Sequence, residues 1–206
     1  MKATPKKILN TAEKLFVKQG VDATSLRAIN TAAGSSQGVL HYHFGNKEKL
    51  LETLLELRMQ PLMEERLTML ADLKQSQTNF SVRALLDVIA LPLARRMIDG
   101  SAADRKVVLL LARLYAENNP VHMRVSVRYF KDSSSDMFQQ LQLGLPELKP
   151  AQLQIRLGIA TTAIFSTIAA INQPRRHWQH SVQQQQIPAW KIVDELLNFL
   201  AKGFEA

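Results

Sequence analysis

The chain has 206 residues, enough for one large or two small domains with a buried core. Its composition, with 46% hydrophobic and 21% charged residues, is that of a globular protein and excludes wholesale disorder. The absence of Cys excludes disulfides, thiolate metal sites and cysteine nucleophiles, and it favours a reducing compartment.

The net charge of +8 is concentrated in the first quarter of the chain. Residues 1–50 hold eight Lys and Arg against three Asp and Glu, whereas residues 51–206 hold 18 against 15. This asymmetry predicts a basic domain over 1–50 that contacts nucleic acid or a membrane surface, followed by a nearly neutral domain over 51–206. The start lacks the apolar run of a signal peptide, and the most apolar stretch, between Arg156 and Arg175, is too polar for a membrane span. We therefore expect a cytoplasmic protein with no membrane partner.

Helical periodicity recurs along the whole chain, and alternating strand patterns are nearly missing, so the sequence predicts an all-α fold. In the basic domain, Gly20, Gly34 and Gly45 are expected to end successive short helices. The helices expected there cover about 5–19, 26–33 and 36–44, and a longer one follows over 46–73. Pro61 is expected to kink or break this fourth helix.

The remaining helices are expected over 80–99, 102–118, 120–143, 151–172 and 188–204, with a polar linker before the last. The last two are apolar on more than one face, and two buried faces need two sets of neighbours. Either they are core helices of one chain, or they contact their twins across a two-fold axis. For the second alternative we expect an interface made by Leu153, Leu157, Ala160, Ile164, Ile168, Val193, Leu196, Leu197 and Leu200. A second stripe lies beside these residues: Ile155, Ile159 and Thr162, with Ile192, Phe199 and Gly203.

Residues 24–44 have the spacing of a helix-turn-helix, with Gly34 at the bend between two short helices. A small core is expected from Leu26, Ile29, Ala33, Val39 and Leu40. Most of the remaining side chains are hydrogen-bond donors or aromatic rings, which suit phosphates and base edges. The expected DNA-binding residues are Thr24, Ser25, Arg27, Ser35, Ser36, Gln37, Gly38, Val39, His41, Tyr42, His43 and Lys47.

Roles for these residues follow from the way a recognition helix enters the major groove. Gln37 can present its amide to adenine, and Gly38 permits a close approach to the bases. Tyr42, one turn further on, is expected at the groove edge, where its phenol reaches a phosphate. Arg27 is expected to contact the DNA backbone, and Lys47 lies at a helix start that favours a phosphate.

The run from Ile8 to about Leu55 resembles the DNA-binding domain of the tetracycline-repressor-like (TetR) family of bacterial transcriptional regulators. The resemblance rests on the Thr-Ser-Leu-Arg-Ala-Ile run at 24–29 and the Tyr-His-Phe-Gly-Asn-Lys run at 42–47. It implies that an all-helical regulatory domain with an effector pocket follows, and that the chain dimerises through its last two long helices. The family often has Ala where Asn30 stands and Tyr where His41 stands, so no operator sequence is carried over. We expect Asn30 to face solvent or the adjacent backbone.

An apolar cavity is expected between the helices of 80–143 and the helix that begins near 151. Its candidate lining is Leu86, Ile89, Leu110, Leu114, Tyr115, Met123, Phe130, Phe138 and Phe165, each of which can equally be plain core.

Other motifs give no support to an enzyme or a metal protein. Residues 34–38 match G-x-S-x-G, but that nucleophile turn follows a strand, and a helix is expected here. The pairs His41/His43 and His177/His180 lack a second matching pair of ligands. We therefore expect no cofactor, no metal site and no catalytic residues.

The sequence thus predicts a bacterial DNA-binding transcriptional regulator that is homodimeric. It is expected to repress at a palindromic double-stranded DNA operator and to be released by a small-molecule effector. Two alternatives remain: a nonspecific architectural DNA-binding protein, and a helical enzyme with a pocket in its larger domain.

Overall fold

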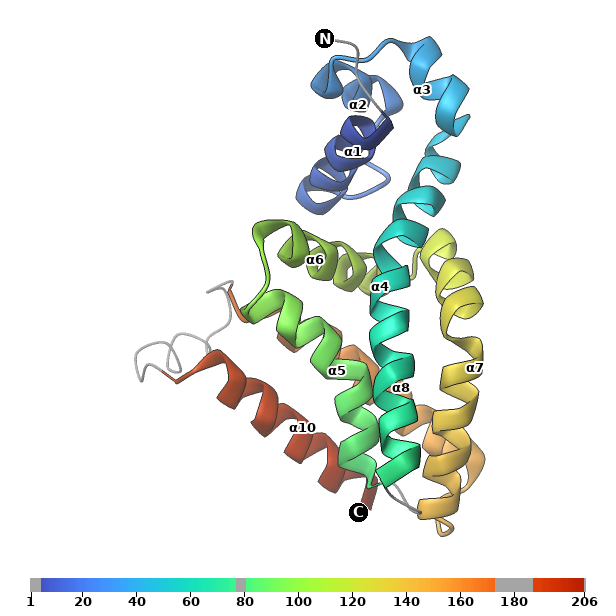
Figure 1. Ribbon diagram of the computed structural model, residues 1–206, viewed down its shortest axis with the longest axis vertical. Coiled ribbons are helices and arrows are strands. Elements are labelled where there is room, and N and C mark those ends of the chain that lie inside the picture. Colours follow the sequence, from blue (N-terminus) through green and yellow to red (C-terminus); the bar gives the residue numbers. More distant parts are fainter. Residues whose placement is uncertain (1–4, 77–80, 173–186, 206) are drawn as a thin grey trace.

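The computed structural model describes residues 5–76, 81–172 and 187–205. These residues form nine helices and no strand, which confirms the all-α prediction. Three short helices make a head at one end of the molecule, and a larger helical body lies below it (Figure 1). The helix α4 (Lys47–Ser76) begins beside the head and runs down through the body.

The head helices begin and end where short-range signals place them. They are α1 (Pro5–Gln19), α2 (Leu26–Ala33) and α3 (Gln37–Phe44). The Ser25 hydroxyl accepts a hydrogen bond from the Ala28 N–H at 3.1 Å, and Ser36 caps α3 in the same way. Gly34 ends α2 with a φ of 63°, a left-handed conformation that a side chain would strain. The three helices share one core of Ile8, Ala12, Phe16, Ile29, Ala33, Leu40 and Phe44.

Asn30 is buried in the head, so the first of its two expected positions, facing solvent, is wrong. Its Oδ1 atom has no hydrogen-bond partner. The amide sits on the inner face of α2 next to Ile29, where an apolar residue would fit without leaving a polar atom unsatisfied.

The fourth helix continues unbroken through Pro61, contrary to the expected break. Pro61 itself is exposed, but the neighbouring Met59 and Leu62 are buried. Packing of these side chains against the body outweighs the local cost of proline, because tertiary contacts routinely override intrinsic propensity. The expected boundary between residues 50 and 51 therefore falls inside one continuous helix.

Five further helices build the body, within one or two residues of the predicted bounds in most cases. They are α5 (Val82–Ile98), α6 (Ala102–Ala116), α7 (Pro120–Gly144), α8 (Pro150–Ala170) and α10 (Ala189–Glu205). Ser81, Ser101 and Asn119 cap α5, α6 and α7 with their side-chain oxygens. Residues 133–136, a Ser-Ser-Ser-Asp run, remain helical within α7. Most of the expected polar linker, with His177 and His180, lies outside the described residues.

The expected dimer face of α8 and α10 is wrong for seven of its nine residues, because they are buried within the single chain. These seven are Leu153, Ala160, Ile164, Ile168, Val193, Leu197 and Leu200, while Leu157 and Leu196 are partly buried. The outward apolar side chains belong to the second stripe, with Ile155 63%, Ile159 61% and Phe199 76% exposed. By length and composition α8 is also long and apolar enough to span a membrane. Only 22% of its most apolar window is buried within the chain. An apolar helix with such an exposed face needs a further neighbour.

Candidate nucleic-acid interface and body cavity

The outer face of α3 presents polar and aromatic side chains to solvent. Gln37, Gly38, His41, Tyr42 and His43 are exposed, and Tyr42 is 85% exposed. The rings of Tyr42 and His43 contact each other edge to face, with their centroids 5.1 Å apart, and this contact holds both rings near the end of the helix. An exposed phenol beside an imidazole, one turn beyond an exposed amide, can contact both phosphate and base edges.

Gly38 faces open space, since a Cβ atom placed there would meet nothing within 4 Å. Arg27 is exposed on α2, and the Ser36 side chain is already used as the cap of α3. Val39 is partly buried against the core of the head, as its place in the expected small core requires.

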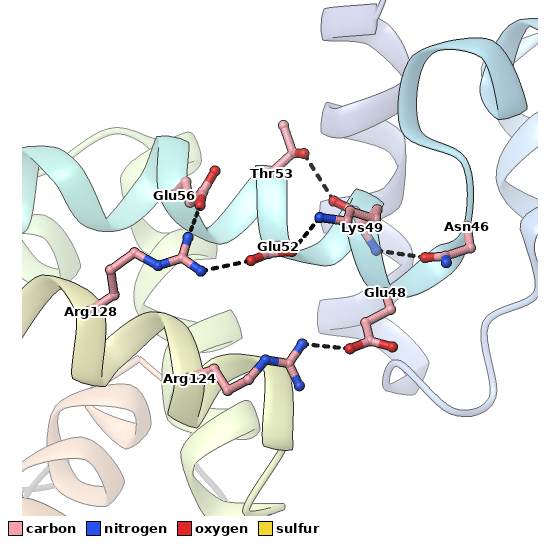
Figure 2. Close-up of polar contacts among 8 residues, drawn as sticks. All are labelled: Asn46, Glu48, Lys49, Glu52, Thr53, Glu56, Arg124 and Arg128. Atoms are coloured by element: carbon pink, nitrogen blue, oxygen red, sulfur yellow. Dashed lines mark hydrogen bonds and ion pairs between the residues drawn. The ribbon is translucent and has the colours of Figure 1, made fainter.

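Two residues of the expected DNA-binding set also make hydrogen bonds within the head. Thr24 is fully buried, and its hydroxyl donates to the Gly20 carbonyl at 2.6 Å. The Lys47 ammonium donates to the Val21 carbonyl at 2.8 Å, so it holds the loop after α1 against the start of α4. Asn46 caps α4 by accepting from the Lys49 N–H (Figure 2).

The head is joined to the body by a buried ion pair. Arg58 of α4 donates to both carboxylate oxygens of Glu13 of α1, at 2.8 and 2.9 Å. Glu13 is only 3% exposed, so this charge depends on its partner. A second contact joins α6 to the end of α1, where Arg113 donates to the Val17 carbonyl at 3.3 Å. The head therefore has contacts with both α4 and α6.

A ladder of surface ion pairs joins α7 to the first half of α4 (Figure 2). Arg124 pairs with Glu48 at 2.5 Å, and Arg128 lies between Glu52 and Glu56 and pairs with both. The hydrogen bond from Arg128 lowers the pKa of the Glu52 carboxyl below its ordinary value. Each exposed pair contributes little by itself, but the group sets how α7 lies along α4.

The body contains a cavity with a volume of about 520 Å³, within the range of small-molecule sites. Five of the nine predicted lining residues are on its wall: Ile89, Tyr115, Phe130, Phe138 and Phe165. Three others, Leu86, Leu110 and Leu114, are buried core residues outside the lining, and Met123 is 55% exposed at the surface. The side of the helix decides which predicted residues line the cavity, because one face of each helix packs in the core and another faces the cavity.

The sequence analysis did not predict the polar residues of the cavity wall. His122 lies on the wall with its ring nitrogen 3.3 Å from the Ser126 hydroxyl, and burial lowers the pKa of His122 to about 4. Arg66 also lines the cavity. It interrupts the apolar spacing of α4 between Leu62 and Leu70, and a cation at a core position is the signal that could have found it.

No group of three or more His, Cys, Asp or Glu that could hold a metal ion occurs within residues 5–76, 81–172 and 187–205. His41 and His43 lie instead on the exposed end of α3.

Two family models match the chain, and together they cover both parts of the fold. The model described as "Bacterial regulatory proteins, tetR family" matches residues 8–54, and "Tetracyclin repressor-like, C-terminal domain" matches residues 87–203. The second alone spans more than half of the chain. The chain belongs to the TetR family. TetR-family proteins are transcriptional regulators with a DNA-binding helix-turn-helix domain, and they are not enzymes.

Curated TetR-family relatives match the head. The chain is 40% identical over 53 residues to the HTH-type transcriptional regulator TtgR of Pseudomonas putida, covering 26% of this chain and 25% of that protein. It is 43% identical over 54 residues to the HTH-type transcriptional regulator AcrR of Shigella flexneri, covering 26% of this chain and 25% of that protein. The chain thus spans about a quarter of the length of these relatives.

Solved structures of TetR-family regulators match nearly the whole fold. A putative tetR family transcription regulator from Shewanella sp. PV-4 has a TM-score of 0.62 at 20% identity, covering 94% of this chain and 96% of that chain. AmtR of Mycobacterium smegmatis has a TM-score of 0.58 at 16% identity, covering 96% of this chain and 86% of that chain. At these identities the likeness concerns the fold alone, so the body carries the family architecture with its own side chains.

Proposed function

We propose that the chain is a cytoplasmic homodimeric repressor that binds a palindromic DNA operator and leaves it when a small molecule fills the body cavity. The observation that carries this proposal is the course of α4. Its first residues adjoin the recognition helix, and its later residues Met59, Leu62 and Arg66 line the cavity. A helix of 30 residues is about 45 Å long, so one rigid element reaches both sites.

The coupling follows from the contacts that α4 makes on the way. The cavity wall includes residues of α7, and α7 is tied to the first half of α4 by Arg124 and Arg128. A ligand that displaces the part of the wall made by α7 also pulls on α4 through these pairs, and the Arg58 pair passes movement of α4 to α1. The effector then acts through the difference in its affinity for the DNA-competent and released conformations.

The DNA-binding half is tested by selecting genomic fragments with the purified protein and measuring their affinity by fluorescence anisotropy over a range of salt concentrations. We expect Arg27→Ala to weaken specific and nonspecific DNA alike and to reduce the salt slope by about 1. Gln37→Ala is expected to lose about 1–3 kcal/mol on the selected site only. The matched control is Lys202→Ala, since Lys202 is exposed near the C-terminal end of α10, far from α3.

Gly38→Ala separates folding from binding. Because Gly38 has open space around it, alanine is expected to stabilise α3 by roughly 0.5–1 kcal/mol in the free protein. If DNA bases approach this backbone closely, the same variant binds the operator less tightly despite its higher stability. A ratio of specific to nonspecific affinity near one, with no loss in Gly38→Ala, would instead favour an architectural DNA-binding protein.

We propose that two copies meet through the outward stripe of α8 and α10. Its positions 155, 159 and 162 on α8, and 192, 199 and 203 on α10, are spaced by steps of three, four and seven residues, as in a helix-packing seam. Gly158 and Gly203 leave open space in which a second backbone can approach. Ile159→Glu is expected to give folded monomers in analytical ultracentrifugation. Ile164→Glu, at a fully buried position, is expected to lower the unfolding temperature instead. A dimer that survives Ile159→Glu and Phe199→Glu would contradict this face.

A further inference from the structure

Arg66 is the one charged side chain deep in the described wall of the cavity, and its surroundings differ from those of other body arginines. Its guanidinium carbon lies 4.4 Å from the centre of the Phe130 ring, and one terminal nitrogen lies 3.9 Å from the Met137 sulfur. Its Nε atom is buried, with no hydrogen-bond partner among the residues that the structure describes. Within the described residues no carboxylate lies within ion-pair distance of it.

Other arginines of the body have an oxygen partner. Arg83 pairs with Asp87 and Asp194, and both Arg95 and Arg96 pair with Glu65. These pairs show that the fold supplies carboxylates where arginines serve its structure. Arg66 has only a ring and a thioether instead.

The energetic balance leaves Arg66 under-compensated. Contact with an aromatic ring recovers only part of the hydration that a guanidinium loses when it is taken out of water. In line with this, burial lowers the pKa of Arg66 to about 10, which still leaves it charged at neutral pH. Arg66 is partly buried as a residue while its Nε atom is fully buried, and a cation in this position is stabilised when an anion arrives.

The charges of the rest of the wall favour the same ligand. The described lining contains the cations Arg66 and Lys131 and no Asp or Glu, and His122 is neutral at pH 7. Most other lining residues are apolar: Met59, Leu62, Ile89, Pro92, Leu93, Leu111, Phe130, Phe138, Leu157 and Phe165 among them. An anion is attracted here, a cation is repelled, and a fully polar molecule would leave its groups unsatisfied.

We propose that the effector of this regulator is an amphipathic carboxylate, whose hydrocarbon body fills the apolar cavity and whose carboxylate pairs with Arg66. The proposal rests on the proposed effector function and narrows it to one ligand chemistry. The planar guanidinium offers two parallel N–H groups that match the two oxygens of a carboxylate, a fit that an alcohol or an amine cannot reproduce.

The test uses matched pairs of small molecules that differ in the head group alone. Decanoate is compared with decanol, and 2-naphthoate with 2-naphthol, by calorimetric titration of the full-length protein without DNA. In at least one pair we expect the acid to bind about 10- to 100-fold more tightly, the gain of a charged hydrogen-bonded pair. Decylammonium is expected to bind more weakly than decanol.

Variants locate the carboxylate. Arg66→Met keeps the length of the side chain and is expected to reduce acid binding to the level of the alcohol, with alcohol binding unchanged. Because it removes an uncompensated charge, the empty variant is expected to unfold at the same or a higher temperature than the parent. Arg95→Met, at an exposed ion pair, is the control that keeps acid binding, and Lys131→Met shows whether the surface lysine holds the anion instead.

Several results would overturn the proposal: equal affinity for acid and alcohol in both pairs, no binding of any of the four compounds, or acid binding unaffected by Arg66→Met. The outcome for the proposed function is read separately from the protein–DNA complex. Acid binding through Arg66 with no loss of operator affinity supports the ligand class and contradicts release by that ligand.

Discussion

Replacing Arg58 with methionine is expected to lower the free energy of unfolding by about 3 kcal/mol. The change removes both hydrogen bonds to Glu13 and leaves that carboxylate, 3% exposed, without its cation. Breaking a buried pair from one side typically costs about 3–5 kcal/mol. The lower value is chosen because the Arg58 side chain is itself 24% exposed, so water can partly replace it.

The measurement is urea unfolding followed by circular dichroism at one fixed protein concentration, since a dimer gains stability with concentration. For a chain of this length, 3 kcal/mol corresponds to a loss of roughly 6–12 °C in unfolding temperature. Arg95→Met is the matched control: its pair with Glu65 is exposed, so its cost should stay below about 1 kcal/mol.

A double variant separates the cost of a lone charge from the value of the pair. Glu13→Leu with Arg58→Met replaces the pair by apolar groups, and we expect it to recover most of the lost stability. The reasoning fails if Arg58→Met costs no more than Arg95→Met, or if the double variant is less stable than Arg58→Met alone. Either result would mean that Glu13 is well solvated without its partner.

Three further predictions concern single groups. Asn30→Ala is expected to raise the free energy of unfolding by about 1 kcal/mol, because it removes a buried oxygen with no partner and adds helix propensity; a loss in urea unfolding would reveal a missed hydrogen bond. Burial lowers the pKa of His122 from 6.5 to about 4, so between these values the unfolded chain binds a proton that the folded chain does not. The free energy of unfolding should therefore fall by roughly 3 kcal/mol as the pH falls from 6.5 to 4, and His122→Gln should lose this part of the pH dependence. Arg128→Met is expected to raise the pKa of Glu52 in an NMR titration, and an unchanged value would contradict the ladder in Figure 2.

Features set by neighbouring residues were predictable from the sequence. The helix ends at Gly34 and Gly45 depend on the backbone within a few residues, so the pattern places them correctly. The continuity of α4 through Pro61 was not predictable in this way, since it depends on packing between Met59, Leu62 and distant helices.

In the candidate sites too, features set by local periodicity were predictable, and contacts between distant segments were not. An exposed side chain such as Tyr42 follows from helix periodicity, whereas the use of Lys47 as a tie to Val21 depends on two segments meeting in space. On α8, the periodicity gives two apolar faces and no means of ranking them. Only the positions of α5, α6 and α10 show that the face with Ile164 is covered and the face with Ile159 is free.

The ion-pair ladder between α4 and α7 has more carboxylates than guanidiniums. Glu48, Glu52 and Glu56 are spaced one helical turn apart, and Arg124 and Arg128 have the same spacing in the same direction. Sliding α7 toward the C-terminal end of α4 by one turn, about 5.4 Å, would match Arg124 with the middle carboxylate and Arg128 with the last. Because Arg128 already pairs with both Glu52 and Glu56, each arginine keeps a carboxylate partner after such a slide, so the ladder can accommodate a change of register between α7 and α4.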